Sequence, residues 1–315
     1  MTAETATLPL TILGGYLGAG KTTLLNNLLQ NNDGLRIGLI VNDFGQVNID
    51  AQLIASHDDS QINLTNGCVC CTMTDGFFEA LESLREGPAP LDHLVVEASG
   101  VADVGKLSQY GHLPGYVLHA VVVVVDAETI RSKTRDKYVG ATVKRQLSQA
   151  DLLILNKCDL ADDVSSLQQW LPDMGVRAPV VKTRFARVDA SVLLGDPVHA
   201  PPPFPAGETV AGHHQAHAHH LSVAVELSEP CAVDVMQSCL ASLSGDVVRC
   251  KGWFNDAAGQ FWEVQGVGLR RQVTQLERQI EGTGKLVLIG VEGVGDPALW
   301  MQHLCNKLPG VTPVE

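Results

Sequence analysis

Hydrophobic residues in the first 195 positions form short, nearly continuous runs rather than alternating patterns. The runs cover residues 8–13, 36–41, 94–97, 117–125, 151–155 and 179–182. Helical stretches fall between several of them, and residues 21–29 have the pattern of an amphipathic helix. Strands that are apolar on both faces and alternate with helices are typical of a parallel sheet between two helical layers. The pattern therefore predicts an α/β domain with a mostly parallel sheet over residues 1–195.

A second pattern begins at residue 221 and predicts a small α+β domain over residues 221–315. Strands are expected at residues 221–227, 247–254, 260–265 and 285–291, and helices at 232–243 and 296–308. Residues 269–280 are ambiguous, since their composition favours a helix but their position beside two strands favours an extended segment. Residues 196–220 separate the two patterns and are rich in proline and histidine, which predicts an exposed linker.

The charge balance narrows the range of partners. The 315 residues include 35 Asp and Glu against 22 Lys and Arg, a formal charge of -13. Such a chain repels nucleic acid and anionic membranes, so neither is expected to bind it. No apolar run approaches the roughly 20 residues of a membrane span, and the N-terminus lacks a secretory signal. We therefore expect a cytoplasmic protein whose eight cysteines are reduced, buried or metal-binding.

The first strand leads into a phosphate-binding loop. Residues 15–22 fit G-x4-G-K-T between a strand and a helix, where backbone N–H groups and the helix dipole attract phosphate. Lys21 is expected to reach the outer phosphates, the Thr22 hydroxyl to bind Mg²⁺, and Thr23 to lie at the α-phosphate. The predicted phosphate-binding residues are Gly15, Gly18, Ala19, Gly20, Lys21, Thr22 and Thr23.

The base is predicted by an N-K-x-D motif directly after the run 151–155. A carboxylate at Asp159 can accept hydrogen bonds from N1–H and the amine of guanine, whereas the N1 lone pair of adenine would repel it. The nucleotide is therefore expected to be GTP. Asn156 is expected to brace the loop and the Lys157 stem to cover the base, and Thr183 is a weaker candidate for the base edge.

Carboxylates follow two of the predicted strands. Glu97 ends one strand and could hold Mg²⁺, and Gly100 would let the backbone approach a γ-phosphate. Asp43 and Asp50 follow the second run, where they could orient the attacking water or hold Mg²⁺; the alternative for them is a polar turn. The predicted catalytic residues are Lys21, Asp43, Asp50 and Glu97.

Three cysteines within four residues form the most distinctive cluster. The thiolates of Cys68, Cys70 and Cys71 suit zinc, copper(I) or iron–sulfur chemistry. Tetrahedral zinc takes four ligands, so the fourth comes from elsewhere or stays open for exchange. The alternative is a turn packed with small buried residues. A histidine run in the linker is either a weak auxiliary metal site or a solvated spacer, and comprises His213, His214, His217, His219 and His220.

Five segments in this order carry a family resemblance: GGYLGAGKTTLLN, VNDFGQVNID, GCVCC, EASGVAD and NKCD. Together they resemble the CobW/YjiA-like family of metal-linked P-loop GTPases in the SIMIBI class, and the region around RCKGWF resembles the small C-terminal domain of that family. The resemblance implies GTP hydrolysis coupled to delivery of zinc, or in some branches cobalt, nickel or iron. NDFGQ replaces the usual NEFGE and EASG replaces E-x-T-G, so the identity of the metal stays open.

The leading hypothesis is a GTPase metallochaperone that passes its metal to a client metalloprotein. GTP would order the loop around Asp43 and Asp50, and coupling of about 1–3 kcal/mol to the cysteines would change metal affinity roughly 5–150-fold. Hydrolysis is expected to be slow without a partner, because no arginine finger is evident near the phosphate loop. A homodimer is also possible. The alternatives are a zinc buffer or sensor, and a P-loop kinase, against which Asp159 and the cysteines argue.

Overall fold

The computed structural model describes residues 7–32, 34–42, 61–64, 75–85, 90–194, 220–276, 280, 284–291 and 295–314. The chain divides into two compact units near residue 202. The predicted linker lies outside the described residues apart from His220, so its limits stay a prediction.

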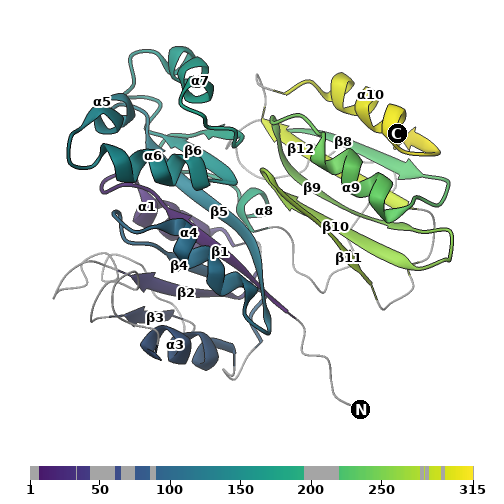
Figure 1. The fold of residues 1–315 in the computed structure, drawn as a ribbon, viewed down its shortest axis with the longest axis horizontal. Helices are drawn as coiled ribbons and strands as arrows, with labels where there is room; N and C mark the ends of the chain where they lie inside the picture. Colours follow the sequence, from purple (N-terminus) through teal and green to yellow (C-terminus); the bar gives the residue numbers. More distant parts are fainter. Residues whose placement is uncertain are drawn as a thin grey trace. The chain divides into compact units, whose positions relative to one another are not determined.

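The first unit is built on a parallel sheet of seven described strands in the order β3-β2-β4-β1-β5-β6-β7 (Figure 1). The strands are β1 (Leu8–Gly14), β2 (Ile37–Asn42), β3 (Gln61–Leu64), β4 (His93–Glu97), β5 (Tyr116–Asp126), β6 (Leu152–Asn156) and β7 (Val180–Lys182). Every neighbouring pair is parallel. The parallel α/β fold predicted from the continuous apolar runs is confirmed.

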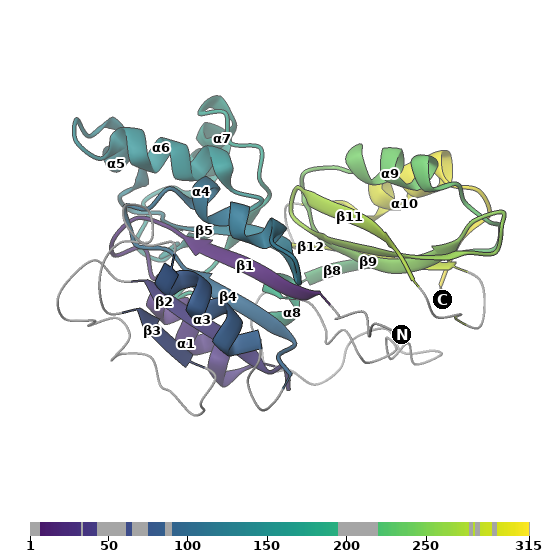
Figure 2. The same ribbon diagram turned by 60° about the horizontal axis from the view of Figure 1, so that its bottom comes forward.

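Helices cover both faces of this sheet (Figure 2). They are α1 (Lys21–Gln30), α3 (Asp75–Arg85), α4 (Val104–Ser108), α5 (Ile130–Arg135), α6 (Gly140–Gln149), α7 (Val164–Asp173) and α8 (Ala190–Leu193), and a 3-10 turn, η1 (Gln109–His112), follows α4. One core joins the sheet to α3, α4, α6 and α7, with Phe77, Leu107 and Leu147 among its buried side chains. On the opposite face, Leu24 and Leu28 of α1 and Leu193 of α8 lie against the strands.

The order of the strands determines where a ligand can bind. β1 lies between β4 and β5, so the connection after β1 runs to one side of it and the connection after β4 crosses to the other. In open parallel sheets, ligands bind at such a reversal, beside the carboxyl ends of the strands. Leu13 is in register with Glu97, and Asp126 with Asn156. The segments that carry the predicted motifs therefore leave the sheet at the same edge.

The described residues of the second unit form a six-stranded antiparallel sheet in the order β11-β10-β9-β12-β8-β13, with two helices on one face. Its elements are β8 (His220–Leu227), α9 (Val233–Ala241), β9 (Val247–Asn255), β10 (Phe261–Val267), β11 (Arg270–Gln275), β12 (Gly284–Val291), α10 (Pro297–Lys307) and β13 (Val311–Pro313). The predicted α+β fold is confirmed. Among the described residues of the whole chain, no helix has the length and apolarity needed to cross a membrane.

The ambiguous segment is extended over residues 270–275, which form β11. β11 pairs antiparallel with β10 over residues 270–275, and Val273 packs against the core of the unit. The guanidinium of Arg271 donates to the carbonyls of Leu240 and Leu243 at 2.6 and 3.3 Å, which satisfies groups at the C-terminal end of α9. Pairing with β10 and these long-range bonds outweigh the helical preference of the local sequence.

Candidate functional site

The loop between β1 and α1 has the backbone conformation that phosphate binding requires. Gly15, Gly18 and Gly20 adopt φ values of 137°, 76° and 106°, which residues with side chains rarely adopt. A Cβ on Gly15 would lie 2.3 Å from the Val124 carbonyl oxygen, so packing also demands glycine there. Gly20 caps α1 without any side-chain hydrogen bond. The first N–H groups of a helix have no partners within the helix itself, so this end of α1 favours an anion.

Lys21 and Glu97 meet beneath this loop. The Lys21 Nζ donates to the Gly15 carbonyl oxygen at 3.1 Å and lies 4.0 Å from the Glu97 Oε1. Their side chains are only 8% and 3% exposed. Thr22 and Thr23 occupy the first turn of α1, where Thr22 is half-buried and Thr23 is exposed. A cation, a buried carboxylate and a hydroxyl therefore lie at one end of the loop, and this donor set fits a nucleotide with its magnesium ion.

The turn after β4 packs directly against the phosphate loop. A Cβ on Gly100 would lie 2.8 Å from the Leu17 backbone nitrogen, so only glycine allows this approach. Gln146 of α6 is 2% exposed and donates from Nε2 to the carbonyl oxygens of Gly100 and Ala102, at 3.3 and 3.0 Å. The sequence interpretation missed Gln146. Gln146 could have been found in the sequence as a polar residue on the apolar face of the helix, next to Leu147.

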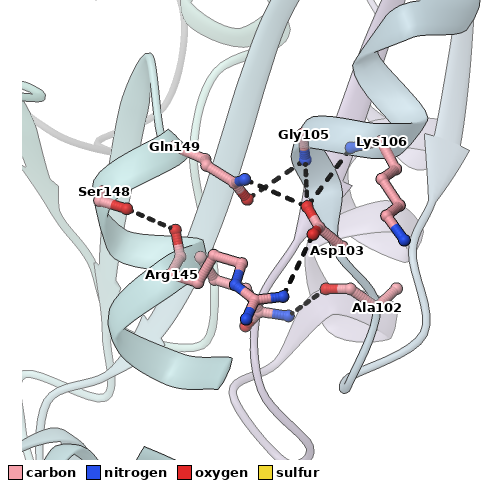
Figure 3. Close-up of polar contacts among 8 residues, drawn as sticks. Ala102, Asp103, Gly105, Lys106, Arg145, Ser148 and Gln149 are labelled. Carbon is pink, nitrogen blue, oxygen red and sulfur yellow. Dashed lines mark hydrogen bonds and ion pairs between the residues drawn. The ribbon is translucent and has the colours of Figure 1, made fainter. Parts of the chain in front are cut away.

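The same helix also holds the start of α4 (Figure 3). Asp103 caps α4 by accepting from the backbone nitrogens of Gly105 and Lys106 at 3.1 and 3.3 Å. Gln149 Nε2 donates to the same carboxylate at 3.1 Å, and Arg145 pairs with it at 3.3 Å. Burial raises the pKa of Asp103, but these bonds outweigh it and hold the pKa below its usual range. The segment 100–106 is thus fixed by three α6 side chains.

Asn156 joins the phosphate loop to the loop after β7. Its Nδ2 donates to the Ala19 carbonyl oxygen at 2.9 Å, and its Oδ1 accepts from the Ala186 nitrogen at 2.8 Å. The side chain is buried, so both bonds are shielded from water. From α1, Asn27 donates to the carbonyls of Phe185 and Ala186 at 2.8 and 3.0 Å. The phosphate loop and residues 183–187 therefore form one hydrogen-bonded assembly.

Lys157 is held by a carboxylate that the sequence interpretation did not identify. Its Nζ lies 2.8 Å from Asp126 Oδ2 at the end of β5. Burial raises the pKa of Asp126, but the hydrogen bond and charge of Lys157 outweigh it, so the pKa lies below its ordinary value. Lys157 itself has a φ of 60°. Fixing its ammonium at Asp126 also fixes the course of its aliphatic stem.

Asp159 lies in an exposed turn beside the 183–187 loop. The backbone of these two segments is joined by a hydrogen bond from the Cys158 nitrogen to the Thr183 carbonyl, at 3.2 Å. The Thr183 hydroxyl donates within its own loop, to the Arg187 carbonyl at 2.6 Å. Leu160 and Phe185 on these segments are 55% and 66% exposed, which is unusual for large apolar side chains. The arrangement offers a carboxylate and apolar surface to a base.

One cation of α5 also reaches the phosphate loop. Lys133 Nζ donates to the Leu17 carbonyl oxygen at 3.3 Å and lies 5.1 Å from the centroid of the Tyr16 ring. The sequence interpretation had assigned no role to Lys133, because nothing in its local pattern relates it to residues 15–22.

Several predicted residues lie outside the described part of the chain: Asp43, Asp50, Cys68, Cys70, Cys71, His213, His214, His217 and His219. His220 is the first residue of β8. Among the described residues, no group of three or more His, Cys, Asp or Glu side chains could hold a metal ion. Cys239 and Cys250 belong to the core of the second unit, where burial raises the pKa of each thiol to about 11.

The amino-acid sequence of this chain is similar to those of several known proteins. Residues 9–182 match the family model described as CobW/HypB/UreG, nucleotide-binding domain. The chain is 32% identical to a Sinorhizobium protein named zinc chaperone CobW, over 94% of this chain and 96% of that protein. It is 34% identical to the zinc chaperone YjiA of Escherichia coli, over 58% and 60% of the two chains. The crystal structure of Zn(II)-bound YjiA GTPase from E. coli aligns with 96% of this chain and 99% of its own, at 23% identity and a TM-score of 0.47.

Proposed function

Because the chain belongs to the CobW/HypB/UreG family, we propose that it is a GTP-hydrolysing metallochaperone. It binds a transition metal, foremost zinc, at Cys68, Cys70 and Cys71, and passes the metal to a client metalloprotein according to its nucleotide state. The observation that carries the proposal is the convergence of three motifs at one sheet edge. The phosphate loop contacts the Glu97 turn there through an ion pair and close packing, and the Asn156 loop through a hydrogen bond.

The nucleotide part of the proposal assigns a role to each described group. The N–H groups of the loop and Lys21 bind the phosphates, and Thr22 and Glu97 hold the magnesium ion. Magnesium supplies positive charge that offsets the charge developing on the phosphates. Asp159 accepts from the guanine edge, while Lys157 and Phe185 cover the faces of the base. Gly100 donates its backbone N–H to the γ-phosphate, which distinguishes GTP from GDP.

The metal part is supported by the names of the relatives and by the thiol chemistry of the cysteine cluster. Several relatives of this chain are named zinc chaperones, and a Schizosaccharomyces pombe relative is named zinc-regulated GTPase metalloprotein activator 1. Zinc is the cargo here, and three thiolates leave one tetrahedral position open for exchange. The cysteines follow the loop that carries Asp43 and Asp50, so a change in that loop on hydrolysis would change their affinity for zinc.

The test is the zinc affinity of the reduced protein, measured by chelator competition without nucleotide, with Mg-GDP and with a non-hydrolysable GTP analogue. We expect a difference of roughly 5–150-fold between the two nucleotide states. The double variant Cys70→Ser/Cys71→Ser should lose tight zinc binding and keep GTP binding, whereas Lys21→Ala should lose the nucleotide effect. Tight zinc binding that ignores nucleotide would instead assign the protein to the buffers. Stoichiometric zinc in the double variant, after removal of residues 213–220, would refute the cysteine site.

A further inference from the structure

The turn that carries Gly100 has a brace outside the nucleotide motifs. Gln146 lies on α6, 46 residues further along the chain, and spans the turn with one amide group. The two carbonyl oxygens that it contacts, on Gly100 and Ala102, are two residues apart. The side chain is 2% exposed, so water does not compete for these bonds. A buried amide that bridges two carbonyls fixes the local backbone in one conformation.

Gly100 needs such a brace because glycine has more backbone conformational freedom than any other residue. On the near side, the Ala98 nitrogen donates to the Leu13 carbonyl of β1 at 2.8 Å. On the far side, Gln146 holds the Gly100 carbonyl. The peptide that carries the Gly100 N–H lies between these two anchors. The carbonyl of the same peptide, on Ser99, accepts from the Ala102 nitrogen at 2.9 Å. Gln146 holds the turn that this bond closes, through the carbonyls of Gly100 and Ala102. The direction of the Gly100 N–H toward the phosphate loop, where a Cβ on Gly100 would lie 2.8 Å from the Leu17 nitrogen, therefore depends on all of these bonds.

We propose that Gln146 is a positioning residue for γ-phosphate recognition: it aims the Gly100 N–H at the γ-phosphate and so sets the preference for GTP over GDP. The inference rests on the proposed function and deepens it. GDP lacks the group that this N–H would contact, so loss of the brace should spare GDP. A hydrogen bond to a charged phosphate oxygen corresponds to roughly a tenfold to hundredfold change in affinity.

The same helix supplies a matched control. Gln149 is also a glutamine of α6, and its amide group bonds Asp103 and the Gly105 nitrogen. It braces the start of α4, whereas the Gly100 carbonyl is held by Gln146. Gln149→Leu should therefore lower thermal stability through the cap of α4 and leave the ratio of GTP to GDP affinity unchanged. The comparison separates loss of aim from general loosening of α6.

The experiment measures affinities for a non-hydrolysable GTP analogue and for GDP, with magnesium, in the full chain and its Gln146→Leu and Gln149→Leu variants. We expect the GTP-to-GDP affinity ratio to fall about tenfold to a hundredfold in Gln146→Leu only, together with the turnover number. An equal loss for both nucleotides, or the same ratio change in Gln149→Leu, would overturn the proposal. If Gln146→Leu does not fold, Gln146→Met carries the test, because it keeps the unbranched shape and removes only the donor. A wild-type chain that binds neither nucleotide would instead count against the proposed function.

Discussion

Replacing Asn156 with alanine removes the side chain that joins the phosphate loop to the loop after β7. Two buried backbone groups lose their partners: the Ala19 carbonyl, at 2.9 Å, and the Ala186 N–H, at 2.8 Å. Ala19 and Ala186 are 2% and 0% exposed, so water cannot readily replace the lost bonds. Each buried group left unsatisfied costs about 1–3 kcal/mol, which gives roughly 2–6 kcal/mol in the free energy of unfolding.

The assay is thermal unfolding followed by circular dichroism, without nucleotide and with saturating Mg-GDP. For a unit of about 200 residues, each kcal/mol lowers the Tm by roughly 2–4 °C, so Asn156→Ala should lower it by about 4–24 °C. The rise in Tm that GDP produces should be smaller in Asn156→Ala than in the wild type, because the phosphate loop is no longer fixed and its affinity for GDP falls.

Asn27→Ala is the matched control, since Asn27 holds the same loop from its outer side. It donates to the carbonyl of Phe185, a residue that is 66% exposed, and to that of Ala186 through a bond that is only partly buried, so water can replace the lost donor at these carbonyls. Its effect on the free energy of unfolding should stay near 1 kcal/mol. A Tm for Asn156→Ala within about 2 °C of the Asn27→Ala value would show that burial of the two bonds is not what makes Asn156 important.

Three further predictions follow from the described residues. Asp159→Asn should weaken discrimination between GTP and inosine or adenine nucleotides, measured by competition binding; an unchanged preference for guanine would contradict the base assignment. The pKa of Asp126 is lower in the folded protein than in the unfolded chain, so its ionised carboxylate stabilises the fold. This stabilisation is fully present above the pKa of the unfolded chain and is lost as the pH falls through the pKa of the folded protein. In Asp126→Asn, the Tm should therefore decrease less steeply below about pH 4 than in the wild type. The same dependence of Tm on pH in both proteins would contradict this. Cys239 and Cys250 should resist iodoacetamide in the native protein at pH 7.5 while exposed Cys305 reacts, as read by mass spectrometry.

The sequence was sufficient for the parallel sheet and for the course of the phosphate loop. Runs such as 94–97 and 151–155 are apolar on both faces, which in a soluble protein is typical of central parallel strands. The motifs sit directly at the ends of these runs, so strand order alone brings them to one edge. No tertiary detail was needed to place Lys21 near Glu97 beyond the pairing of β1 with β4.

The braces around the site could not be predicted in the same way. Gln146, Gln149 and Asp126 act through partners 31 to 46 residues away, and nothing in their local pattern names those partners. β11 shows the same limit for secondary structure. Its residues favour a helix by composition, and only pairing with β10 makes them extended. Periodicity reports which face is buried, but it does not report which buried polar group meets which backbone group.

The chemical nature of these braces is itself informative. Asn156, Gln146 and Asn27 all hold backbone groups around the phosphate loop through neutral amides. A carboxylate in such a place would repel a triphosphate, and a cation would bind the phosphates itself and compete with Lys21. An amide fixes the backbone without adding net charge, so the field at the site is set by the few charged groups there: Lys21, Glu97, the N-terminus of α1 and Lys133, which donates to the Leu17 carbonyl. Other charged braces occur further out, where Arg145 pairs with Asp103 and Lys157 with Asp126. Most of the bonds that hold the loops therefore leave the electrostatics of the site unchanged.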